Sequence, residues 1–165
     1  ATAEIYTLSL HDALPILAAL IAPRLNFSQV ISELSLVEED SLVRAEALRD
    51  LAGFYWKRGL PEAALGAWRA AWQVDTDNLL PALELIQAQL DLKLLADARA
   101  TLNQAERTSR RNTELDFLWG RLHEAEGELP AAEASYKRAR DTAPTITKYR
   151  DALWAVREKQ GKSPW

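Results

Sequence analysis

Residues 45–78 read AEALRDLAGFYWKRGLPEAALGAWRAAWQVDTDN, and their spacing decides the fold because it recurs twice further along the chain. Residues 79–112 and 113–146 align beneath this stretch without a gap, which gives three blocks of 34 residues. In the second half of every block, two alanine positions coincide and a bulky residue lies between them. The coinciding residues are Ala64, Ala98 and Ala132, then Trp68, Leu102 and Tyr136, then Ala71, Ala105 and Ala139. A constant period of this length predicts a repeat architecture.

Each block contains the pattern of two amphipathic helices, because its apolar residues recur three and four positions apart. Gly59 with Pro61, and Gly127 with Pro130, mark a turn followed by proline near the first helical position. Lys93 stands where the other blocks have glycine, so the second turn has the weakest signal. The first halves are expected to pack through Leu48, Leu51, Ala52 and Tyr55; Ala82, Leu85, Ile86 and Gln89; and Leu118, Trp119 and Leu122.

The three blocks resemble tetratricopeptide (TPR) repeats, which are helix-turn-helix units with small and aromatic residues at fixed places. The first block matches at Ala52, Tyr55, Gly59, Ala64, Trp68 and Ala71; the second at Ala98, Leu102 and Ala105; and the third at Gly120, Gly127, Ala132, Tyr136, Ala139 and Pro144. The resemblance implies an all-α fold, an α-solenoid in which three repeats (45–78, 79–112 and 113–146) form a right-handed superhelix.

The ends of the chain do not follow the repeat. Residues 4–16, EIYTLSLHDALPI, resemble a translated sequencing adapter, so we expect residues 1–16 to be a non-native scar. Residues 17–44 are predicted to be a helical segment, the remnant of an earlier repeat. Residues 147–165 fit either a capping helix or a truncated fourth repeat. We therefore expect a piece of a larger, bacterial protein, whose compartment stays open.

The composition narrows the function. The chain has 165 residues, with 20 Lys and Arg against 24 Asp and Glu, and no cysteine. This balance argues against a nucleic-acid partner, because nonspecific phosphate binding needs a strongly basic surface. The absence of cysteine excludes thiolate catalysis and disulfides. We also expect no direct membrane insertion, because the apolar run at residues 13–22 is too short to span a bilayer.

The predicted binding surface lies on the first helices, opposite their packing faces, where the family forms its concave groove. It mixes aromatic, aliphatic and charged side chains, as surfaces that bind an extended segment or an amphipathic helix do. Its residues are Arg49, Trp56, Lys57, Leu83, Gln87, Leu90, Phe117, Arg121 and Glu124. Trp68, Trp72, Trp119 and Tyr136 are instead assigned to packing.

The sequence offers no catalytic or cofactor motif. His123 is the only histidine beyond the scar, and we expect it to be structural because it falls on a packing side. Glu124, Glu126 and Glu128 scatter around a helix end, and we see no metal-ligand spacing.

We therefore predict a non-catalytic scaffold that binds a protein or peptide, without a cofactor. The alternative is a regulatory or recruiting TPR segment of an enzyme whose catalytic domain lies in missing sequence. A helical-repeat RNA-binding protein is a further alternative, disfavoured by the near-neutral charge.

Overall fold

The computed structural model describes residues 41–109 and 112–163, which form seven α-helices and no strand. The predicted scar and the segment 17–40 lie outside the described residues. The chain divides after Pro81 into two compact units. The helices are α3 (Ser41–Lys57), α4 (Pro61–Val74), α5 (Leu80–Asp91), α6 (Leu95–Thr108), α7 (Thr113–Ala125), α8 (Leu129–Thr142) and α9 (Thr147–Lys159).

The first unit contains the hairpin of α3 and α4. Pro61 opens α4, where its missing N–H costs no helical hydrogen bond. The buried face of α4 combines small and large residues, and that of α3 does the same. These buried residues are Ala64, Ala67, Trp68, Ala71 and Trp72 on α4, with Ala45, Ala47, Leu48, Leu51, Ala52 and Tyr55 on α3. The packing roles predicted for Trp68 and Trp72 are confirmed.

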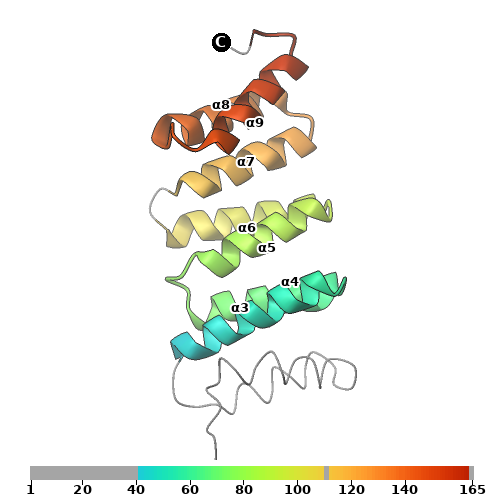
Figure 1. The fold of residues 1–165 in the computed structure, drawn as a ribbon, viewed down its shortest axis with the longest axis vertical. Helices are drawn as coiled ribbons and strands as arrows, with labels where there is room; N and C mark the ends of the chain where they lie inside the picture. The colour runs from blue at the N-terminus through green and yellow to red at the C-terminus, as the bar shows by residue number, and fades with distance from the viewer. Residues whose placement is uncertain (1–40, 110–111, 164–165) are drawn as a thin grey trace, which may run out of the picture. The chain divides into compact units, whose positions relative to one another are not determined.

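In the second unit, α7, α8 and α9 pack in chain order around a shared core (Figure 1). Tyr136 of α8 and Leu153 and Val156 of α9 are buried together, and Phe117 of α7 packs against them. The α-helical hairpin of α5 and α6 precedes them, with Leu85, Ile86 and Leu102 fully buried. The all-α helical-repeat architecture predicted from the sequence is therefore confirmed.

The turns that end α3, α5, α7 and α9 share one backbone conformation. Gly59, Lys93, Gly127 and Gly161 have φ values of 71°, 58°, 82° and 68°. In each turn two backbone N–H groups donate to carbonyls three and five residues earlier, a C-terminal cap that needs a left-handed residue. The second of these bonds joins Leu60 to Tyr55, Leu94 to Gln89, Glu128 to His123 and Lys162 to Arg157. The second turn thus forms despite Lys93, at a cost of about 1 kcal/mol.

Gly161 therefore ends α9 as Gly59 and Gly127 end the first helices of hairpins. Trp154, however, occupies the place in α9 that Gly120 has in α7, 34 residues earlier. Trp154 is partly exposed, and the Arg150 guanidinium lies 4.8 Å from the centre of its ring. The turn at Gly161 is the one expected of a fourth repeat, whereas the bulky Trp154 side chain is the one expected of a capping helix. The structure therefore does not decide between these two predictions for residues 147–165.

Helices α7 and α8 of the second unit lie in close contact at Gly120. A Cβ atom at this position would lie 2.4 Å from Cδ1 and Cε1 of Tyr136, whose side chain is 1% exposed. The ring of Tyr136 is confined by the core and cannot yield space. A side chain of any size at position 120 would therefore separate α7 from α8.

One sequence-based assignment was wrong, and another holds only in part. Trp119 is only partly buried, and Leu115 takes its expected place in the core beside Leu118 and Leu122. Leu90, assigned to the binding surface, is 7% exposed and belongs to the core. It lies four residues after Ile86, on the same helical face.

We predict that Gly120→Ala lowers the free energy of unfolding by about 2 kcal/mol, because the new methyl group overlaps the Tyr136 ring. Gly53→Ala is the matched control, since no atom lies within 4 Å of its added Cβ and the position is inside α3. It should raise the free energy of unfolding by about 0.5–1 kcal/mol through helix propensity. Urea denaturation measures both, and a stabilising Gly120→Ala would contradict the packing described here.

Candidate protein-binding surface

In the first unit, the three predicted binding residues differ in exposure. Lys57 is exposed, whereas Arg49 and Trp56 are half-buried. Arg49 Nη2 lies 3.3 Å from Asp50 Oδ1, and the ring of Trp56 lies 5.8 Å from that of Trp68. Trp56 therefore contributes to the packing of its own hairpin as well as to the surface.

In the second unit, α5 presents Leu83 and Gln87 as partly exposed side chains. Gln87 Nε2 donates to Asp91 Oδ1 at 3.1 Å, and Arg121 Nη2 of α7 donates to the same oxygen at 3.0 Å. These bonds bring Gln87 and Arg121, predicted separately from two blocks, to one carboxylate. The first helices α5 and α7 therefore present neighbouring surfaces.

Phe117 contributes more to packing than its prediction as a binding anchor implies. Its ring centre lies 5.6 Å from that of Tyr136 and 5.3 Å from that of Tyr149. Lys148 Nζ lies 5.1 Å from the same ring, in cation–π geometry. Phe117 thus joins α7, α8 and α9, and only part of its surface can reach a ligand.

Two further ion pairs join α7 to α9. Glu114 accepts hydrogen bonds from Lys148 Nζ at 2.7 Å and from Tyr149 Oη at 2.7 Å. Glu124 accepts from Lys159 Nζ at 2.6 Å and from Tyr136 Oη at 2.6 Å. Together with the Asp91–Arg121 pair, these ion pairs connect α5, α7 and α9. We call the surface that carries the three pairs, Asp91–Arg121, Glu114–Lys148 and Glu124–Lys159, the first-helix face.

Burial and hydrogen bonding shift the pKa of Glu124 in opposite directions and that of Tyr136 in the same direction. Burial alone would raise the pKa of Glu124, but the hydrogen bonds from Lys159 and Tyr136 outweigh it and lower this pKa. Burial raises the pKa of the Tyr136 hydroxyl, and its bond to the Glu124 carboxylate raises it further. The charged form of Glu124 is therefore stabilised by its hydrogen bonds from Lys159 and Tyr136, a role that the sequence alone does not show.

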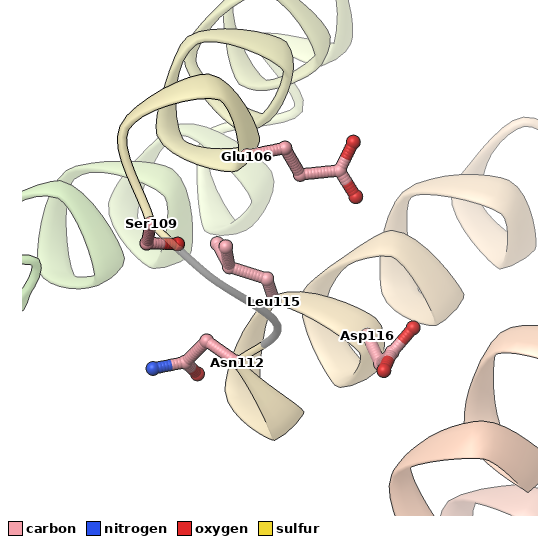
Figure 2. A pocket seen from close by; sticks show the side chains of 5 residues that line it. All are labelled: Glu106, Ser109, Asn112, Leu115 and Asp116. Carbon is pink, nitrogen blue, oxygen red and sulfur yellow. The ribbon is translucent and has the colours of Figure 1, made fainter.

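A small hollow lies where α6 meets α7 (Figure 2). It has a volume of about 280 Å³ and is lined by Glu106, Ser109, Asn112, Leu115 and Asp116. Three of its polar side chains have partners: Glu106 accepts from Trp119 Nε1, Asp116 accepts from Arg138, and Asn112 caps α7 at the Glu114 N–H, whereas the buried Ser109 Oγ has no partner among the described residues.

His123, the one histidine among the described residues, lies close to two glutamates. Its Nδ1 lies 2.8 Å from Glu128 Oε2 and 3.9 Å from Glu126 Oε2. The two glutamates that the sequence analysis treated as scattered thus gather around this imidazole. The signal that could have revealed them is Gly127, because a left-handed turn returns the chain toward α7.

These hairpins have the fold of TPR domains. Solved structures with this fold include the first TPR of Spaghetti (RPAP3) bound to the HSP90 peptide SRMEEVD, with a TM-score of 0.65 and 21% identity over 76% of this chain and 99% of that one. The thermophilic TPR protein TTC0263 of Thermus thermophilus has a TM-score of 0.66 and 23% identity over 93% and 84%. The Arabidopsis OM64 TPR domain has a TM-score of 0.65 and 16% identity over 73% and 99%.

No protein-family model and no curated protein sequence matches the chain. The fold is therefore assigned from the repeat pattern and the similar structures. Within the described residues, none of the helices combines the length and the apolar run required to cross a membrane.

We predict that the free energy of unfolding falls as the pH drops below the ordinary carboxyl value of 4.5, because the pKa of Glu124 and that of Glu133 are lowered in the folded state. The pKa of Glu133 falls mainly through its hydrogen bond from Lys162. A group of this kind stabilises the fold above its unfolded pKa and loses that effect as it is protonated. Urea denaturation between pH 7 and pH 3 measures the trend.

The Glu124→Gln variant should be less stable at pH 7 and should lose less stability on acidification than the parent chain. Glu62→Gln, in the exposed first turn of α4, is the control and should leave the acid dependence unchanged. If the free energy of unfolding fell by the same amount on acidification in Glu124→Gln and in the parent chain, the pKa of Glu124 would not be lowered in the folded state.

Proposed function

We propose that this chain is a non-catalytic protein-interaction scaffold that binds an extended segment or an amphipathic helix on its first-helix face. The observation that carries the proposal is the set of ion pairs between successive first helices, Asp91–Arg121, Glu114–Lys148 and Glu124–Lys159. They hold side chains from α5, α7 and α9 on a common surface. Several partly exposed residues there combine apolar and polar character, as peptide-binding surfaces do.

The charges on this face favour a partner that is not strongly acidic. Arg121, Lys148 and Lys159 each already face a carboxylate of the same surface. A peptide rich in carboxylates would have to displace these pairs and would leave acidic groups of the scaffold without their cations. We therefore infer that the partner contributes apolar contacts and main-chain hydrogen bonds, and that Leu83 and Gln87 are among its contacts. The RPAP3 domain, by contrast, is bound to the acidic peptide SRMEEVD.

The alternative function, a recruiting segment of an enzyme, shares this surface and places catalysis in sequence beyond the described residues. The proposal does not require it, since the first-helix face needs no catalytic group to hold a peptide.

The test is selection of ligands from a phage-displayed library of random dodecamer peptides, followed by fluorescence polarisation with the enriched peptides. The double variant Leu83→Ala with Gln87→Ala should weaken binding by about tenfold, because both side chains are partly exposed on α5. Phe117 and Trp56 stay intact, since their rings pack against other aromatic residues and their loss would destabilise the fold.

The matched control is Gln104→Ala with Lys137→Ala, two exposed residues on the second helices α6 and α8. It should leave the affinity unchanged. Peptides that bind both double variants equally, or a selection that enriches no peptide, would contradict the proposal.

A further inference from the structure

The turn between α7 and α8 gathers three groups with metal-binding chemistry. His123 lies in the last turn of α7, Glu126 caps the end of α7, and Glu128 precedes α8. One ligand atom from each, an imidazole nitrogen and two carboxylate oxygens, lies within 4.8 Å of the others. The left-handed Gly127 and the backbone hydrogen bond from Glu128 to the His123 carbonyl, 2.8 Å long, produce this convergence.

The imidazole of His123 packs against an aromatic ring of the same helix, which restrains its orientation. The His123 ring stacks on Trp119, with centres 5.5 Å apart and planes inclined by 24°. Trp119 in turn donates its Nε1–H to Glu106 Oε1 at 2.7 Å. This second layer limits the rotation of His123 and keeps Nδ1 directed toward the two carboxylates, as outer groups do around metal ligands.

We propose that His123, Glu126 and Glu128 form a binding site for one divalent transition-metal ion of the zinc type. Three protein ligands plus water complete a tetrahedral zinc site, in which ligand atoms about 2.1 Å from the metal lie about 3.4 Å apart. The Nδ1 to oxygen distances of 2.8 Å and 3.9 Å lie on either side of that spacing. Small side-chain rotations therefore suffice to coordinate the ion.

Charge and ligand type favour the same class of ion. Two carboxylates neutralise a divalent cation, and the end of α7 adds the negative pole of its helix dipole. The imidazole ligand favours zinc, cobalt or nickel over magnesium and calcium, which prefer oxygen ligands. The side chains of His123 and Glu126 are 19% and 21% exposed and that of Glu128 is 55% exposed, so water competes less at the first two ligands than at the third.

Arg99 is the competitor for this site. Its Nη2 pairs with Glu126 Oε2, and its guanidinium lies 5.7 Å from the centre of the Trp119 ring. A metal ion must share Glu126 with this cation or displace it. Removal of the Arg99 charge should therefore tighten metal binding, which distinguishes a built site from nonspecific attraction to surface carboxylates.

The experiment uses the full chain, freed of metal by a chelator and titrated with cobalt chloride. We expect one cobalt ion per chain, visible absorption bands of a low-coordinate site, displacement of cobalt by zinc chloride, and a rise in the melting temperature with zinc. The proposal is independent of peptide binding, because the assay contains no peptide. No saturable binding in the parent chain would overturn it.

Single substitutions test which residues coordinate the ion. His123→Gln and, separately, Glu128→Gln should each weaken cobalt binding by at least about tenfold, while Arg99→Gln should strengthen it. The controls are His11→Gln, at the chain's other histidine, and Glu62→Gln, which should both bind as the parent does. Circular dichroism verifies that each variant is folded. Unchanged binding in His123→Gln, or binding lost in His11→Gln, would overturn the assignment.

Discussion

The second unit depends on the volume that α7 leaves for α8 at Gly120. The absence of a side chain there lets the Tyr136 ring lie against the helix backbone. Ala52 with Trp68, and Ile86 with Leu102, occupy the same places in the other hairpins, and all four are buried. In two hairpins a small residue, Gly120 or Ala52, is paired with a large aromatic residue of the second helix. In the third hairpin two aliphatic residues of medium size are paired. Where the residue on the second helix is an aromatic ring, the residue on the first helix is small, so the two positions are filled together.

This packing also orders the surface. Once the Tyr136 ring is fixed, its hydroxyl reaches Glu124, and Glu124 holds Lys159 of α9. The same ring contacts Phe117, whose other neighbour is Tyr149. The core and the first-helix face are therefore connected through single residues. A ligand on this face would meet side chains whose positions are already set, which reduces the conformational entropy lost on binding.

The repeat period allowed the hairpins, their turns and the buried alanines to be predicted, because these features depend on spacing alone. The side on which a residue at the edge of a helix points was harder to predict. Trp119 lies beside the stripe of Leu115, Leu118 and Leu122, and its size suggested burial, yet the smaller Leu115 fills the core. Leu90 was misplaced for the converse reason, since it lies at the border of the buried face of α5.

The candidate site was predictable only in part. Sequence spacing placed Gln87, Arg121 and Glu124 on the first helices, but it did not reveal which charges pair across helices. Those pairs join residues 30 or more positions apart, as in Arg121 with Asp91 and Lys159 with Glu124. The grouping of His123 with Glu126 and Glu128 depends on the left-handed turn at Gly127, and the glycine in the sequence predicts this turn but not the directions of the two glutamate side chains.

The shared volume is tested most directly by a double-mutant cycle that gives the α7–α8 hairpin the residue pair of the α5–α6 hairpin. The free energy of unfolding is measured for Gly120→Ile, Tyr136→Leu and the double variant. If the two positions share one space, the leucine relieves the overlap caused by the isoleucine. The double variant is then more stable than the sum of the single effects predicts, by about 1 kcal/mol or more. Strictly additive effects would contradict the account.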